Sequence, residues 1–241
     1  MSHAATFGST GMDFHDPVAA SLHLGFALWC LFAGAILFRL TRNHPIGHRL
    51  SVAVYSLSAV VLYICSGLFH SLRYDSEADP QFEFFRRLDL SAIFALIAGS
   101  CVPIFVYVLP KWWRAASLTL ELASAATGIV LVWSMQEVVT QTLIFVYIGM
   151  GFVAMVPLHI YARKWGWRGL ALMVLFAGFY VVGAIAQAVK WPSYYHIVLH
   201  IADMIATLLH FVLLVKFNLH YAQNARKSSL ASISGAFPAN R

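Results

Sequence analysis

The stretch Tyr195-His196-Ile197-Val198-Leu199-His200-Ile201-Ala202-Asp203 opens the last long apolar segment of the chain, residues 194–216. A run of about 20 mainly apolar residues is typical of a helix that crosses a bilayer. On such a helix His196 and His200 lie one turn apart on the same face, and Asp203 shares that face. Two imidazoles and a carboxylate are costly in hydrocarbon, so their presence predicts a functional site.

Six further apolar runs precede this segment, and the whole chain has the composition of a membrane protein. Of its 241 residues, 60% are hydrophobic and 11% are charged, whereas a soluble domain carries about 25% charge. We therefore predict an all-α, polytopic, seven-transmembrane helix bundle. The expected domain covers 18–217, between an N-terminal tail (1–17) and a basic C-terminal tail (218–241). The first six spans are expected at about 18–38, 50–70, 88–109, 115–135, 141–161 and 169–189.

The loops between the spans hold most of the charge. The longest is expected at 71–86, and a basic loop with Arg163, Lys164 and Arg168 is expected after the fifth span. Twelve of the 16 lysines and arginines follow spans one, three, five and seven. This bias predicts a plasma (inner) membrane protein with its N-terminus outside and its C-terminus in the cytoplasm. The net charge of +6 thus reports orientation, and we expect no nucleic-acid partner.

Topology brings polar residues from distant spans to one membrane face. The second span ends at His70, the third begins near Asp89, and the seventh begins with His196 and His200. No crossing separates the end of the second span from the start of the third, and four crossings separate the start of the third from the start of the seventh. Because both numbers are even, all three span ends share a face whichever way the protein is inserted. By the charge bias that face is the outer one.

Three histidines at one depth fit a zinc site. His70, His196 and His200 would supply three nitrogen ligands and leave one position open, which is the pattern of catalytic zinc. Asp89 would bind a water in that position or fix a histidine from behind. Ser66, one helical turn before His70, would join this network. The alternative is that these histidines only make hydrogen bonds between helices.

Other polar residues in the spans have less defined roles. Asp203 is expected to line the substrate pocket below the metal, or to pair with Glu121 or a buried tyrosine, rather than to bind the ion. His23 could reach the pocket from the first span but has no partner in the sequence. His210 is expected to pack or to make hydrogen bonds deeper in the seventh span.

At this point the residues resemble those of the hemolysin III family, which belongs with the progestin and adipoQ receptors and the alkaline ceramidases. The likeness runs from about 18 to 216. It is most specific in three places. They are Ala53–Ser58 with Leu62–Ser71, Arg87–Ile93 with Ile97–Pro103, and His196-x3-His200 with His210 before Phe211.

The resemblance implies a seven-helix membrane protein with zinc on His70, His196 and His200. It also implies that Ser66 and Asp89 support a metal-bound water. Alkaline ceramidases are zinc amidases that cleave ceramide to sphingosine and a fatty acid. Two features depart from the pattern. Asp203 stands where an aliphatic residue is expected, and the predicted orientation resembles the ceramidases rather than the adiponectin-type receptors.

Three functions remain open from the sequence. The first is a zinc-dependent hydrolase of a lipid amide, ceramide-like, or of a lipid ester, with membrane lipids as its partners. The second is a receptor or regulator in which the zinc is structural, and a structural zinc usually has four protein ligands. The third is a cytolysin-like pore or transporter that uses Asp203, Glu121 and His210 as a polar path.

Overall fold

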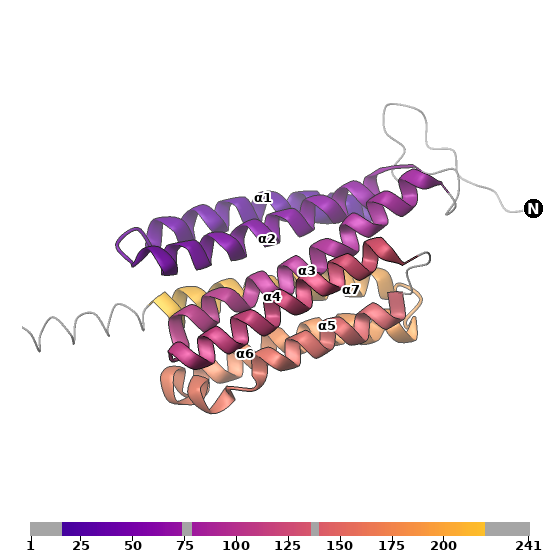
Figure 1. Ribbon diagram of the computed structural model, residues 1–241. Coiled ribbons are helices and arrows are strands. Elements are labelled where there is room, and N and C mark those ends of the chain that lie inside the picture. The colour runs from indigo at the N-terminus through magenta and orange to yellow at the C-terminus, as the bar shows by residue number, and fades with distance from the viewer. Residues whose placement is uncertain (1–15, 74–78, 136–139, 220–241) are drawn as a thin grey trace, which may run out of the picture.

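A computed structural model describes residues 16–73, 79–135 and 140–219. Within these residues the chain consists of long helices joined by short connections, with no β-strand, as predicted (Figure 1). The elements are α1 (Pro17–Leu40), α2 (Ile46–Ser71), α3 (Pro80–Val108), α4 (Lys111–Ser134), α5 (Thr140–Met155), α6 (Leu158–Val189), α7 (Tyr195–Leu213) and a π-helical turn, η1 (Leu214–Leu219).

The helices have the length and composition of membrane spans. Within the described part of the chain, six helices are long and apolar enough to cross a bilayer, and α5 is a shorter apolar helix of 16 residues. Large apolar side chains point outward, such as Leu28 (69% exposed) and Phe32 on α1. An exposed apolar surface of this kind is favourable in contact with lipid and unfavourable in contact with water. The protein is an integral membrane protein.

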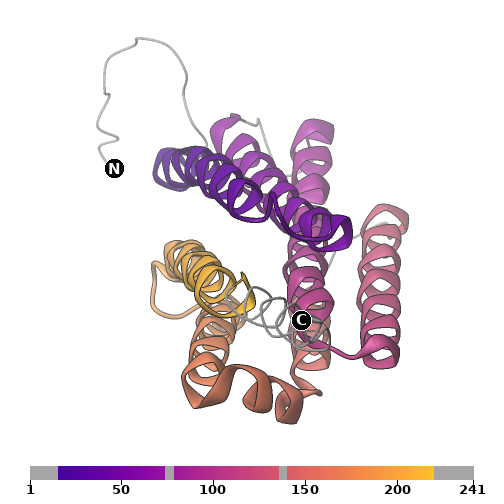
Figure 2. The same ribbon diagram turned by 90° about the vertical axis from the view of Figure 1, so that its left-hand side faces the viewer.

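Helix α3 lies at the centre of the packing. It contacts α2, α4, α5, α6 and η1, while α1 packs on α2 and α6 packs on α7. Viewed end-on, α1 and α2 lie on one side of the bundle and α6 and α7 on the other (Figure 2). Helices α2 and α3 approach each other closely at Gly99, where a Cβ atom would overlap the Ser58 side chain. Small residues at this crossing let the two backbones meet.

The third span begins two turns earlier than predicted. Helix α3 starts at Pro80, so residues 80–86 of the expected 71–86 loop are helical. The Asp79 carboxylate accepts a hydrogen bond from the Gln81 amide at 2.8 Å, and a proline in the first turn is compatible with the helix. Glu83 pairs with Arg86 and Arg87 at the spacing of neighbouring turns, which stabilises the added segment.

The break between the fifth and sixth spans also differs from the prediction. Helix α5 ends at Met155 instead of residue 161, and α6 starts at Leu158, directly after Pro157. The expected basic loop is therefore part of α6, on both sides of a kink at Gly166 (φ 67°). A positive φ is accessible to glycine at little cost, so the chain turns there without strain.

The other spans end within a few residues of their predicted bounds. The expected tails fall almost entirely outside the described residues, apart from Asp16 and Pro17 at one end and Asn218 and Leu219 at the other. The domain boundaries at 18 and 217 thus stay predictions.

Candidate metal centre

The structure brings His70, His196 and His200 together at one end of the bundle. The His70 ring centroid lies 5.0 Å from each of the other two, and the His196 and His200 centroids lie 4.3 Å apart. The two Nε2 atoms of the α7 pair are 3.0 Å apart. His70 and His200 are buried and His196 is half-buried.

A fourth histidine, His23 of α1, packs against this triad. Its ring lies 4.3 Å from that of His200, edge-on, and 5.8 Å from that of His70. His23, His70 and His200 each offer a ring nitrogen, and these nitrogens lie within 4.8 Å of one another. The three come from α1, α2 and α7, so side chains on three helices converge on one buried point.

Ser66 and Asp89 lie behind His23. The Ser66 hydroxyl is 3.2 Å from His23 Nε2, and it also hydrogen-bonds the Asp89 carboxylate. Ser66 is buried and Asp89 is half-buried. The two residues expected to support the metal site are therefore adjacent to it and linked to each other through one hydroxyl.

A carboxylate from the start of α1 adds a second group of donors. Asp16 offers an oxygen within 4.8 Å of nitrogens from His70 and His196. Its side chain also caps α1 by accepting a hydrogen bond from the Ala19 amide at 3.0 Å. Its backbone N–H donates to the His70 carbonyl at 2.9 Å. The residue that caps α1 is thus tied to the last turn of α2.

Neither Asp89 nor Asp203 belongs to a group of three closely spaced metal donors within the described part of the chain. Asp203 lies deeper, and its backbone carbonyl accepts a hydrogen bond from the Tyr63 hydroxyl at 3.2 Å. Its carboxylate is in electrostatic range of Tyr63 and Tyr180. Asp203 was expected beside a substrate pocket, Glu121 or a buried tyrosine. The structure shows buried tyrosines near it.

A network of hydroxyl groups continues inward from the histidines. Thr207 Oγ1 lies 2.9 Å from the Tyr63 hydroxyl and 3.1 Å from the Tyr180 hydroxyl. The Tyr55 hydroxyl donates to the Thr207 carbonyl at 3.3 Å, and its ring lies 4.7 Å from that of His210. This network fixes the helices below the site. Glu121 lies at another place in the core, within electrostatic range of Cys101 and Tyr161.

The donor set fits a transition metal. Neutral imidazole nitrogens suit zinc, copper, iron and nickel, and nitrogens on one tetrahedral zinc, each 2.0–2.1 Å from the ion, lie about 3.3–3.4 Å apart. The 3.0 Å separation of the His196 and His200 Nε2 atoms is close to that value. The donors are also held by buried helices, which gives them little freedom to move away.

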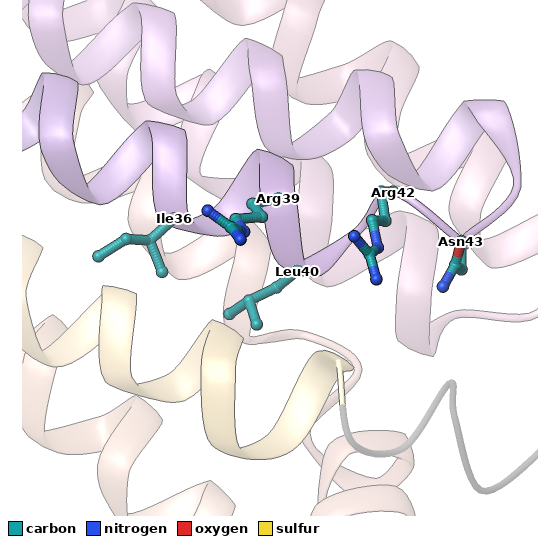
Figure 3. A pocket seen from close by; sticks show the side chains of 5 residues that line it. All are labelled: Ile36, Arg39, Leu40, Arg42 and Asn43. Atoms are coloured by element: carbon teal, nitrogen blue, oxygen red, sulfur yellow. The ribbon is translucent and has the colours of Figure 1, made fainter.

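The opposite end of the bundle has a different kind of concavity. A pocket of about 380 Å³ is lined by Ile36, Arg39, Leu40, Arg42 and Asn43, which all come from the end of α1 and the turn after it (Figure 3). Its polar groups are two guanidinium groups and an amide. Guanidinium groups attract anions and do not ligate metal ions, and the pocket is separate from the histidines.

His23 and Asp16 are the donors that were not assigned to the site from the sequence. The signal that could have found them is the same topological argument that united the other histidines, because the first span begins at the face where the second span ends. Asp16 also directly precedes a proline, a typical helix start, which would have placed its carboxylate at the mouth of the site.

Comparison with known proteins agrees with this architecture. The sequence model of haemolysin-III related proteins matches residues 14–211, which include every histidine and carboxylate of the candidate site. The ADIPOR-like receptor IZH1 of Eremothecium gossypii is 24% identical over 206 residues. That alignment covers 76% of this chain and 64% of the relative, so the chain spans slightly less than two thirds of the relative's length.

Proposed function

The chain belongs to the haemolysin-III related family, and from this premise we propose that it is a zinc-dependent membrane hydrolase acting on a lipid amide of the ceramide type or on a lipid ester. The observation that carries the proposal is the convergence of His70, His196 and His200, with ring centroids 4.3–5.0 Å apart, beside the Ser66–Asp89 pair. Histidine ligands next to a carboxylate are a common arrangement in zinc hydrolases.

In this proposal the three histidines hold the zinc. When bound, zinc supplies a Lewis acid that polarises a carbonyl and makes water a better nucleophile near neutral pH. His70 comes from α2 and the other two from α7, so the relative position of these helices sets the geometry of the site.

Asp89 and Ser66 handle the water and its proton. The Asp89 carboxylate would orient the water molecule that attacks the acyl carbon, and it would accept the proton of that water. Ser66 holds the carboxylate in place through its hydroxyl. Hydrolysis consumes one water, whose hydroxyl ends on the acyl carbon and whose proton ends on the leaving nitrogen or oxygen.

The surroundings of the site favour a lipid as substrate. Residues next to the histidines in the sequence point outward, among them Leu24, Leu68 and Ile201, which are 38–44% exposed. Lipid chains would therefore lie within one or two residues of the site. A substrate that resides in the bilayer could place its amide or ester bond at the histidines while its chains stay in hydrocarbon.

The proposed orientation puts the histidine end outside, in the plasma (inner) membrane, and the basic end in the cytoplasm. Arginines gather at that basic end, with Arg39 and Arg42 lining the pocket there, in line with the excess of basic residues on cytoplasmic loops. A reporter fused after the last helix tests this orientation. Activity of a cytoplasm-only reporter is expected, and a signal from outside the cell would contradict it.

The hydrolase is tested with detergent-purified protein loaded with one equivalent of zinc. A fluorescent short-chain ceramide and a matched lipid ester are supplied in mixed micelles, and release of the labelled fatty acid is measured. We expect turnover of at least one of them in the wild type and none in His200→Ala. His44→Ala, in a histidine at the other end of the bundle, is the control and should keep full turnover. Turnover by zinc-free His200→Ala would refute the proposal.

A second function is favoured by the number of donors. His23 and Asp16 bring the possible ligands to five, and a site filled by protein ligands is typical of structural zinc. The relative from Eremothecium gossypii is named as a receptor. Protein that binds zinc tightly but releases no fatty acid from either lipid would support a receptor or regulator with the zinc as a structural element.

A further inference from the structure

We propose that the pocket at the end of α1 binds one anionic phospholipid, with the lipid phosphate held by Arg39 and Arg42 and an acyl chain lying along α1. The pocket is at the end of the bundle opposite the candidate metal centre, so this inference goes beyond the proposed function and does not depend on a metal. Its volume is about 380 Å³, and Ile36, Leu40 and Asn43 line it together with the two arginines (Figure 3). The pocket therefore combines two positive charges with apolar walls, as an anionic lipid requires.

The backbone at the end of α1 holds the two arginines beside the same pocket. Arg39 lies in the last turn of the helix, and the Arg42 amide donates to the Arg39 carbonyl at 3.3 Å. Thr41 between them is buried, and its hydroxyl donates to the Leu37 carbonyl at 2.9 Å. A guanidinium group can bind two phosphate oxygens through parallel hydrogen bonds. Two such groups on one fixed turn are well suited to a phosphate.

The sequence places no acidic side chain near this pocket. The chain has ten Asp and Glu residues. Nine of them lie before α1, between α2 and α3, between α4 and α5, or in the first ten residues of α3 and α7, which all belong to the histidine half of the bundle. The tenth, Glu121, is buried in the middle of α4, and residues 220–241 include basic but no acidic side chains. An anion from outside the chain would therefore neutralise Arg39 and Arg42.

The apolar side of the pocket continues along α1 toward the hydrocarbon. Phe32, Ile36 and Leu40 follow one another at intervals of four residues, so they lie along one face of the helix. Phe32 is 65% exposed and Leu40 is 43% exposed. The helix rises by about 12 Å over these eight residues. An acyl chain would cover this face while its phosphate stays at the arginines, whereas a free phosphate ion would leave the face bare.

Other arginines at this end are in contact with aromatic rings. The Arg49 guanidinium lies 4.9 Å from the centroid of the Phe38 ring, and that of Arg168 lies 5.7 Å from the Trp167 ring. Exposed basic residues at a membrane surface attract anionic lipids in a general way. Arg39 and Arg42 differ because they share a pocket, so we expect one tightly held lipid in addition to this general attraction.

The test counts the lipids that stay bound to the full-length protein in a neutral detergent. Native mass spectra are recorded while phosphatidylglycerol, phosphatidylcholine or diacylglycerol with the same acyl chains is added to the micelles. We expect one phosphatidylglycerol per chain to bind more tightly than either of the other lipids. Equal binding of phosphatidylglycerol and phosphatidylcholine by the wild type would overturn the inference.

The double variant Arg39→Gln/Arg42→Gln tests the residues. It should weaken binding of the first phosphatidylglycerol about 30-fold, because each basic side chain beside an anionic lipid contributes roughly fivefold. The matched control is Arg163→Gln/Arg168→Gln, which removes the same charge from exposed positions on α6 at this end. It should have little effect, because salt screens exposed charges that do not touch the lipid. An equal loss in both double variants would indicate general attraction and overturn the inference.

Two further arms identify the site and the source of the phosphate. His200→Ala should keep the phosphatidylglycerol, and loss of the lipid in this variant would place it at the histidines and contradict the inference. Glycerol 3-phosphate is then added as a soluble competitor at the concentration of the lipid. The lipid should stay bound, because the competitor has no acyl chain to cover α1. Complete displacement would assign the pocket to a soluble phosphate and overturn the proposal of a lipid site.

Discussion

Two pairs of histidines in this chain have the same spacing and very different surroundings. His196 and His200 lie on one continuous helix, with ring centroids 4.3 Å apart and Nε2 atoms 3.0 Å apart. His44 and His48, at the other end of the bundle, have ring centroids 6.4 Å apart. His44 there contacts the Tyr107 hydroxyl through Nδ1 at 3.3 Å.

The cause of the difference is Pro45. It caps the start of α2 with an extended backbone, so His44 lies before the helix and His48 lies within it. A residue before proline is disfavoured in helical conformation, and the two rings do not share a helical face. The spacing of two histidines therefore predicts a metal pair only where one helix runs through both, and where other helices bring further donors.

The largest expected effect is the loss of metal in His200→Ala. Removing a nitrogen at the centre of the group should abolish stoichiometric zinc, measured by elemental analysis of protein purified without chelators. His44→Ala removes one histidine of a pair with the same four-residue spacing, and this variant should keep about one zinc per chain. Equal zinc content in the two variants would show that the two histidine pairs are equivalent.

Metal binding should also stabilise the folded bundle from the histidine end. A ligand at 100 times its dissociation constant adds about 2.7 kcal/mol to the free energy of unfolding. Chelation should therefore lower the unfolding temperature of the wild type in detergent, and zinc should restore it. The unfolding temperature of His200→Ala should be the same with and without zinc. If zinc raised the unfolding temperature of this variant as much as that of the wild type, the ion would bind elsewhere.

A smaller effect is expected for Asp89→Asn, which removes the charge of the supporting carboxylate and keeps its shape. Loss of an outer partner of a ligand typically weakens metal binding about 10–100-fold. Chelator competition gives this number directly. Asp79→Asn is the control, because the Asp79 carboxylate caps the start of the same helix. This variant should leave zinc affinity unchanged.

The smallest effects concern tyrosines near each pair. Tyr63→Phe removes the hydroxyl that contacts Thr207 and the Asp203 carbonyl. Hydrogen bonds between membrane helices contribute about 0.6 kcal/mol on average and up to about 1.7. Tyr107→Phe loses only one contact, to His44, and should cost less. Reversible unfolding in detergent measures both, and a larger loss in Tyr107→Phe would contradict this order.

Most of the fold could be predicted because hydropathy is a local signal. The spans followed from apolar runs, and the joining of His70, Asp89 and the α7 pair followed from topology alone. The start of α3 and the break before α6 were predicted wrongly, although Asp79-Pro80 and Pro157 carry ordinary helix-start and helix-break signals. In both places the helix starts at the local signal, whereas the prediction followed the hydropathy of the neighbouring residues.

The donors from α1 were harder to predict. The topology argument places His23 at the correct face, but only packing shows that α1 lies beside α7 and turns this histidine toward His200. Hydrophobic periodicity gives no such information here, because α1 is apolar on all sides and no face is marked as interior. The roles of the site residues stay predictions until the metal is measured.

The hydrogen bond between the Asp16 amide and the His70 carbonyl has a practical consequence for handling the protein. It connects Asp16, where the described part of the chain begins, to a candidate ligand, so a bulky fusion joined close to Asp16 would act on His70 through this hydrogen bond. A polyhistidine tag placed there would also bring competing imidazoles to the mouth of the site. An affinity handle after α7 is separated from the histidines by the full length of that helix and leaves their chemistry undisturbed.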